Sequence, residues 1–220
     1  MKPKYCLTLL SALSYSILLF PQQPDEFVKK AEAILLTLAD NNIFPEKDFS
    51  ELKNLLFTEN SEDLVTKYHS ACSSLDSLRT HLLGFENEKA NVTADSALTL
   101  FVNWYLHLQR TFYNYNKENF FNSTKTKILF FSTSMSCHCT LEMCKKQLVE
   151  ILKLKNESND DYSFLVVDSY WNNDLQLKYE AFFAPSALVF NQSNEVFLKI
   201  EYEEKMIEQL IAFLSETEKI

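Results

Sequence analysis

Apolar side chains over residues 25–118 recur every three or four positions, which is the period of one face of an α-helix. Polar residues, proline and glycine divide this pattern into four stretches, at residues 25–40, 45–57, 61–83 and 93–112. None of the stretches shows the alternation of apolar and polar residues that is typical of a half-buried strand. The pattern predicts an all-α helical domain over residues 23–118.

A different pattern follows the polar bridge at residues 115–119. Short continuous apolar runs, typical of strands buried on both faces, occur at residues 127–132, 162–168, 186–190 and 195–200. Helical spacing is found at residues 141–154, 173–182 and 204–214. The order β-α-β-α-β-β-α predicts one mixed sheet over residues 119–220, in which the polar turn 191–194 joins the last two strands into an antiparallel hairpin. The expected fold is therefore an α/β domain preceded by a helical domain.

The first 22 residues have the pattern of a signal peptide. Lys2 and Lys4 precede an apolar run of about 15 residues, which is shorter than the roughly 20 residues that a membrane-spanning helix needs. We expect residues 1–22 to be removed, leaving an exported protein without a membrane span in a periplasm, outside the cell or in the lumen of the secretory pathway. An uncleaved N-terminal anchor is the alternative.

Composition excludes several classes of function. The formal net charge is −9, and a nucleic acid is not an expected partner because binding to phosphates needs clustered cations. Gly84 is the single glycine of the chain, so the glycine-rich loops that bind nucleotide phosphates cannot form.

Three of the five cysteines, Cys137, Cys139 and Cys144, lie where the predicted strand 127–132 leads into the predicted helix 141–154. Free backbone N–H groups and the positive end of the helix dipole stabilise a thiolate at such a junction. We expect Thr140 to be the N-cap, with Cys137 and Cys139 just outside the helix and Cys144 about one turn inside it. His138, when protonated, would lower the pKa of its neighbours further.

The segment 127–154, the strand end at Asp168, the sequence Ala184-Pro185-Ser186 and the final hairpin and helix together resemble the thioredoxin superfamily. The resemblance implies that a redox-active cysteine pair opens the first helix and that a cis-proline, here Pro185, faces it. Ala184 and Pro185 would then contact the reactive sulfur or a bound substrate chain. The chain departs from the family in its Cys137-His138-Cys139 spacing, and Phe130 stands near the place where many members have a buried acid.

Together with the export expected from residues 1–22, the resemblance implies a thiol–disulfide oxidoreductase that acts on protein thiols without a cofactor. One of Cys137 and Cys139 would attack as the thiolate and the other would resolve the mixed disulfide; in a second version Cys144 is the resolving thiol. Two alternatives remain open at this point. Cys137, His138, Cys139 and Cys144 could hold copper or zinc in a chaperone of the same fold, or a structural disulfide could staple a redox-inactive interaction module.

Overall fold

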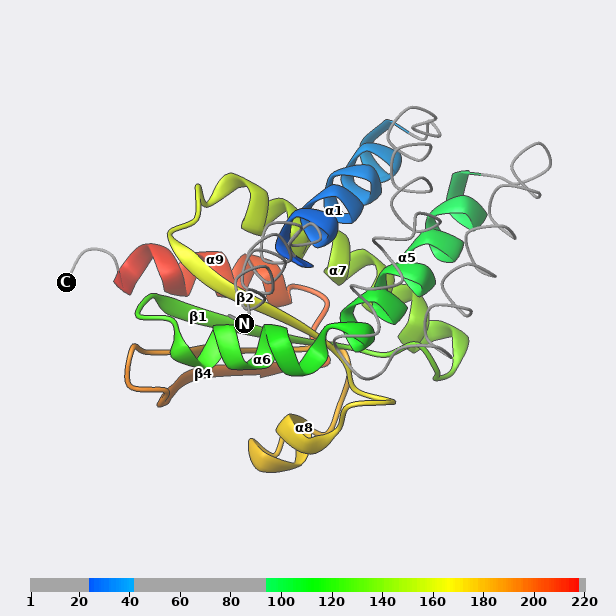
Figure 1. The fold of residues 1–220 in the computed structure, drawn as a ribbon. Helices are drawn as coiled ribbons and strands as arrows, with labels where there is room; N and C mark the ends of the chain where they lie inside the picture. The colour runs from blue at the N-terminus through cyan, green and yellow to red at the C-terminus, as the bar shows by residue number, and fades with distance from the viewer. Residues whose placement is uncertain (1–23, 42–93, 218–220) are drawn as a thin grey trace, which may run out of the picture.

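The structure, a computed structural model, describes residues 24–41 and 94–217 of the 220-residue chain (Figure 1). Its elements are α1 (Pro24–Asn41), α5 (Ala94–Thr111), α6 (Tyr113–Asn122), β1 (Thr126–Ser132), α7 (His138–Glu157), β2 (Tyr162–Asp168), α8 (Asp174–Lys178), β3 (Ser186–Phe190), β4 (Val196–Glu201) and α9 (Met206–Thr217). None of the helices in these two ranges has the length and apolarity needed to cross a membrane.

The four described strands form one mixed sheet in the order β2-β1-β3-β4. β1 runs parallel to β2 and antiparallel to β3, and β3 runs antiparallel to β4. Ser132 therefore pairs with Asp168, and Ser186, which pairs with Glu201, lies beside the end of β1. We call this the Ser132 end of the sheet; the loops after β1, β2 and β4 and the loop before β3 all meet there.

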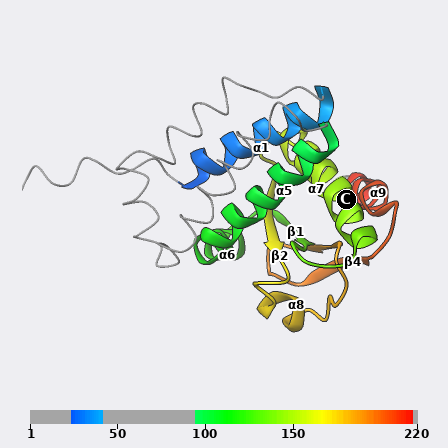
Figure 2. The same cartoon turned by 90° about the vertical axis from the view of Figure 1, so that its right-hand side faces the viewer.

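Each face of the sheet is covered by helices, which explains why its strands read as continuous apolar runs. One face packs against α1, α5, α7 and α9 through residues such as Ile128, Phe130 and Val166. The other packs against α6 and α8 through Leu129, Phe131 and their neighbours. Figure 2 shows α1 and α5 side by side on the same face as α7. The two described helices of the N-terminal half thus belong to the same core as the sheet.

An ion pair ties α1 to this core. Both carboxylate oxygens of Glu32 lie 2.8 Å from Lys155 Nζ on α7, and the Tyr105 hydroxyl on α5 donates to Glu32 at 2.8 Å. Glu32 is buried, so its charge needs both partners.

The sheet and its helices confirm the predicted α/β fold. β2 and β3 have the predicted bounds, and the hairpin turn at 191–194 is present. The polar bridge at 115–119 lies inside α6, where Tyr113 and Phe120 are two turns apart and both face the sheet. Its polar residues form the outer face of that helix. The predicted helix 173–182 shortens to α8.

Several predictions fall outside the described residues. These are the signal peptide over 1–22 and the helices expected at 45–57 and 61–83. Residues 118 and 119, between which the domain boundary was expected, both lie in α6. The division into two domains stays a prediction.

Candidate functional site

Two free thiols lie side by side where β1 passes into α7 at the Ser132 end of the sheet. Cys137 is the N-cap of α7, with extended backbone angles, and Cys139 is in the first helical turn. Both thiols are exposed, and their sulfur atoms are 2.8 Å apart. The N-cap is Cys137, three residues before the expected N-cap Thr140. Cys139 is therefore inside the helix and not outside it. The strand-to-helix junction therefore presents two sulfur atoms to solvent.

Hydrogen bonds lower the pKa of the Cys137 thiol to about 6. The largest contribution comes from the Cys139 side chain, followed by the hydroxyl and the backbone N–H of Thr140 and then by Ser136. All of these donors stabilise a thiolate more than a thiol. Cys137 is therefore largely ionised at neutral pH, which is the state that attacks a disulfide. His138, expected to assist, is exposed at the first position of α7.

Thr140 connects Cys137 to Tyr202, which follows the outer strand β4 at the same end of the sheet. Its hydroxyl oxygen lies 3.2 Å from Cys137 Sγ and 3.3 Å from the Tyr202 hydroxyl. Tyr202 follows β4, and its backbone N–H donates to the Pro185 carbonyl at 2.9 Å. The thiol, the helix and the segment before β3 are thus joined through one tyrosine.

The peptide bond between Ala184 and Pro185 is cis, which confirms the isomer that the resemblance implied. Pro185 is buried and Ala184 is half-buried. Tyr202 bonds both to the Pro185 carbonyl and to Thr140, so this peptide bond lies on the same side of the molecule as the thiols. Contact of Ala184 and Pro185 with a substrate chain stays a prediction.

Cys144 is not brought together with the other two cysteines. Its thiol is 2% exposed, and burial raises its pKa to about 11. Its surroundings are Thr133, Ser132 and Asp168. Seven residues separate it from Cys137, a helical rise of about 10 Å, whereas a disulfide needs Cα atoms within about 7 Å. A bond to Cys144 therefore requires the start of α7 to unwind.

Asp168, known from the sequence only as a strand end, is a buried acid beside Cys144. It is 2% exposed, and one carboxylate oxygen accepts the backbone N–H groups of Ser134 and Tyr170 at 3.1 and 3.2 Å. Burial raises its pKa in spite of these bonds. Because Asp168 pairs with Ser132, two residues after Phe130, it lies on the same face as Phe130 on the neighbouring strand. An acid ending an apolar run was the one signal in the sequence.

The proposed metal ligands do not converge. Within residues 24–41 and 94–217, no group of three or more His, Cys, Asp and Glu side chains is arranged to hold a metal ion. Of the four ligands considered, Cys137, His138 and Cys139 are exposed, whereas Cys144 is buried. Three exposed donors and one buried donor on the same helix cannot surround one ion without a rearrangement of α7.

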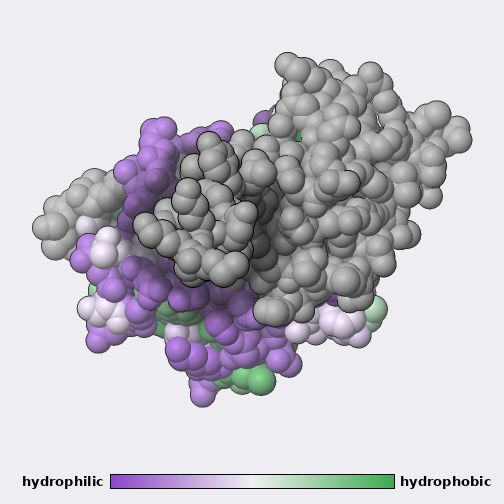
Figure 3. All heavy atoms as spheres, in the orientation of Figure 1, coloured by the Kyte–Doolittle hydropathy of each residue, from purple (hydrophilic) through white to green (hydrophobic). Residues whose placement is uncertain are grey.

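Large apolar side chains surround the Ser132 end of the sheet. The loops that meet there expose between 43% and 62% of six such side chains, which we call the apolar rim: Met135, Tyr170, Trp171, Phe182, Phe183 and Tyr202. On the face shown in Figure 3 the described surface is mostly hydrophilic, with hydrophobic colour in small separate patches. The Arg110 guanidinium on α5 stacks 4.5 Å from the Trp171 ring centre, so the N-terminal half reaches this rim. Exposed apolar surface of this kind is typical of interaction sites.

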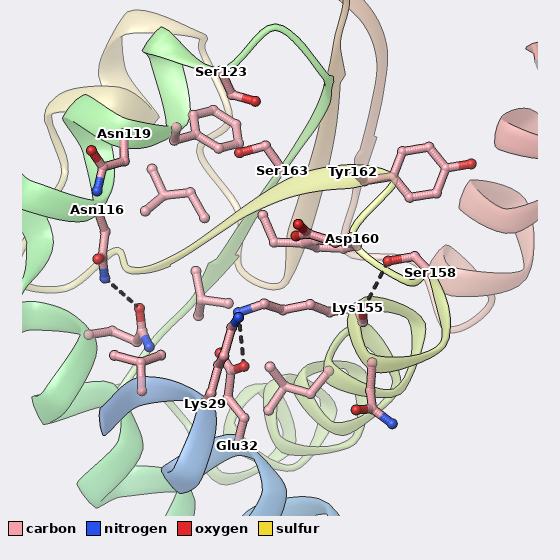
Figure 4. Close-up of a pocket in the computed structure, with 18 of the residues that line it drawn as sticks. Lys29, Glu32, Asn116, Asn119, Ser123, Lys155, Ser158, Asp160, Tyr162 and Ser163 are labelled. Atoms are coloured by element: carbon pink, nitrogen blue, oxygen red, sulfur yellow. Dashed lines mark hydrogen bonds and ion pairs between the residues drawn. The ribbon is translucent and has the colours of Figure 1, made fainter. Parts of the chain in front are cut away.

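A pocket lies beside the outer strand β2, away from the thiols, and none of the predicted site residues lines it (Figure 4). It has a volume of about 900 Å³ and is walled by α1, α6, the end of α7 and β2. The Glu32–Lys155 pair lies at its wall. Its chemistry is separate from that of the two thiols.

No protein-family model and no curated protein matches the sequence. Solved structures similar to the chain include mitochondrial thioredoxin 3 of Saccharomyces cerevisiae, with 16% identity, a TM-score of 0.37, and coverage of 46% of this chain and 89% of that one. The germline-specific thioredoxin Deadhead of Drosophila melanogaster shares 17% identity with a TM-score of 0.39, over 46% of this chain and 92% of that one. The sheet order, the strand directions and the order of elements are those of a divergent thioredoxin-like fold in the C-terminal half.

Proposed function

We propose that this chain, whose C-terminal half has a thioredoxin-like fold, is an exported thiol–disulfide oxidoreductase that acts on protein thiols through Cys137 and Cys139. One observation carries the proposal: two exposed thiols lie 2.8 Å apart at a helix N-terminus, and one has its pKa lowered to about 6. Such a thiol is ionised, accessible and next to a second thiol, which are the three conditions for exchange.

The exchange proceeds in two balanced steps. The thiolate of one cysteine attacks a sulfur of the substrate disulfide, so that a mixed disulfide forms and the other substrate sulfur leaves as a thiolate. The second cysteine then loses its proton and attacks the mixed disulfide, forming the Cys137–Cys139 bond and releasing the first substrate sulfur. The substrate gains two electrons and two protons, and the chain loses them. The reverse sequence oxidises a substrate dithiol, and a small thiol or disulfide outside the chain restores the starting state.

The surface around the thiols supports a polypeptide substrate. The apolar rim offers a large hydrophobic area to a polypeptide segment that exposes its own apolar side chains. Ala184 and Pro185 would position that segment against the reacting sulfur. The extracytoplasmic location of the protein rests on the pattern of residues 1–22.

Single cysteine variants test the proposal. We expect one of the two variants Cys137→Ser and Cys139→Ser to accumulate a covalent mixed disulfide with a disulfide-containing model substrate such as insulin. In that variant the resolving thiol is lost, so the mixed disulfide cannot be released. The other variant forms no adduct, because the attacking thiol is lost. Cys144→Ser is the matched control and retains exchange. Full exchange by the Cys137→Ser/Cys139→Ser double variant would refute the proposal.

The proposed exchange needs no metal ion. We therefore expect the anaerobically purified chain to contain no stoichiometric copper or zinc. One metal ion per chain, lost in Cys139→Ser, would replace the redox function by metal binding.

A further inference from the structure

We infer that Tyr202 is a positioning residue that acts through Thr140 to make Cys137 the attacking thiolate and Cys139 the resolving thiol. The inference rests on the proposed function and assigns the roles that it leaves open. Two independent features support it: a chain of hydrogen bonds that ends on Cys137, and a tyrosine held in a backbone conformation that bulky residues avoid.

The direction of the hydrogen bonds follows from counting protons. A Cys137 thiolate can only accept, so the Thr140 hydroxyl, 3.2 Å away, must donate its single proton to it. The Thr140 oxygen then accepts from the Tyr202 hydroxyl at 3.3 Å. Each bond in such a chain polarises the next, so the phenol strengthens the bond that Thr140 gives to the sulfur.

Cys139 completes the set of donors around the same sulfur. With Cys137 as acceptor, the proton between the two sulfur atoms, 2.8 Å apart, lies on Cys139. No charged side chain contributes to the lowered pKa of Cys137, and the titratable groups beside it are Cys139 and the adjacent His138, with Tyr202 one bond further. Hydrogen bonding therefore separates the roles of the two cysteines.

The backbone conformation of Tyr202 supports a role for its side chain at this position. Its φ angle is 53°, in the left-handed region, which costs a bulky residue about 1 kcal/mol or more and which glycine adopts freely. Its N–H holds the Pro185 carbonyl, and its hydroxyl reaches Thr140. Residues in such conformations cluster where a side chain has a function. Tyr202 thereby links the segment that would bind the substrate with the sulfur that would attack it.

The rate of Cys137 alkylation by iodoacetamide, measured against pH by mass spectrometry of the full chain, tests the inference. Because a hydrogen bond to a charged group contributes about one to two pKa units, we expect Thr140→Val to raise the midpoint by about one unit. Tyr202→Phe raises it by less, and Thr140→Ser restores the wild-type profile. Tyr202→Phe has no further effect in a Thr140→Val background, because Tyr202 acts only through Thr140.

The contrary results are equally definite. Equal shifts from Tyr202→Phe in both backgrounds, or no shift in Thr140→Val, would overturn the relay. Circular dichroism and thermal unfolding of each variant identify any that is misfolded. Thr140→Ser and Tyr202→Phe are the least disruptive substitutions, and they keep the test usable if Thr140→Val fails to fold. In the trapping experiment, the relay requires Cys139→Ser to be the variant that accumulates the adduct. Alkylation needs no disulfide exchange, so a failed relay and a failed function give different results.

Discussion

Cys137 and Cys144 share one helix and have opposite chemistry. Cys137 is exposed at the N-cap with its pKa lowered to about 6, whereas burial raises the pKa of Cys144 to about 11. A low pKa together with exposure makes a cysteine reactive, and burial in apolar surroundings makes it inert.

The contrast predicts selective alkylation of the folded chain. Between pH 7 and 8 we expect Cys137 to react at least ten times faster than Cys144, because only Cys137 is both ionised and accessible. As the pH falls through about 6, the Cys137 rate falls with its thiolate fraction. Mass spectrometry of the modified chain measures both rates. In urea the two rates converge; similar rates without denaturant would show that Cys144 is accessible in the fold.

Asp168 predicts a pH-dependent gain in stability on substitution. Because burial raises its pKa above the unfolded value, the folded chain binds this proton more tightly, and the stabilisation is lost as pH rises through the folded pKa. Asp168→Asn keeps an oxygen that can accept from Ser134 and Tyr170 and removes the charge. We expect the free energy of unfolding of the variant, measured in urea, to increase relative to that of the wild type as the pH rises from 4 to 8. A difference that is the same at every pH would contradict this assignment.

Among the elements, the strands were predicted more closely than the helices. β2 and β3 coincide with short, mostly apolar runs, so their limits could be predicted from the sequence. The start of α7 was missed because Thr140 is a good cap by residue type, whereas the chain caps the helix at Cys137 without a side-chain hydrogen bond. The role of Tyr202 could not be foreseen, since it depends on the approach of residues 62 positions apart.

The buried ring of Phe130 in the central strand β1 contributes to the stability of the sheet. Phe130 lies in β1 between β2 and β3 and is fully buried. We expect Phe130→Ala to lower the free energy of unfolding by about 3–5 kcal/mol, the usual cost of removing a buried ring. Phe197→Ala in the outer strand β4, where the ring is 59% exposed, is the matched control and costs less than about 1 kcal/mol. Urea unfolding measures both, and equal costs would mean that β1 is not the centre of the core.

The described helices α1 and α5 of the N-terminal half share one core with the sheet. Ile34 and Leu35 of α1 are fully buried in the cluster that contains Ile128 and Phe130 of β1. Elements that share a core unfold together when their contacts are extensive. The expected separation into two domains at residue 118 competes with this packing.

Hydrogen exchange distinguishes the two descriptions. We expect Ile34→Ala to lower the free energy of unfolding by about 2–5 kcal/mol and to lower the protection of the β1 amides by the same free energy. Lys146→Ala, on the exposed face of α7, changes both by less than about 0.5 kcal/mol. Unchanged β1 protection in Ile34→Ala would show that α1 unfolds apart from the sheet.

The central claim is that Cys137 and Cys139 form a reversible dithiol–disulfide couple, and equilibrium redox titration with mass-spectrometric mapping tests it most directly. The full chain is equilibrated in thiol–disulfide buffers between roughly −100 and −300 mV, the range of known catalysts, and its remaining thiols are then alkylated. We predict a single two-electron transition in that range, in which Cys137 and Cys139 change together and Cys144 remains a thiol. A pair that stays reduced or stays oxidised throughout, or a bond that includes Cys144, would contradict the claim.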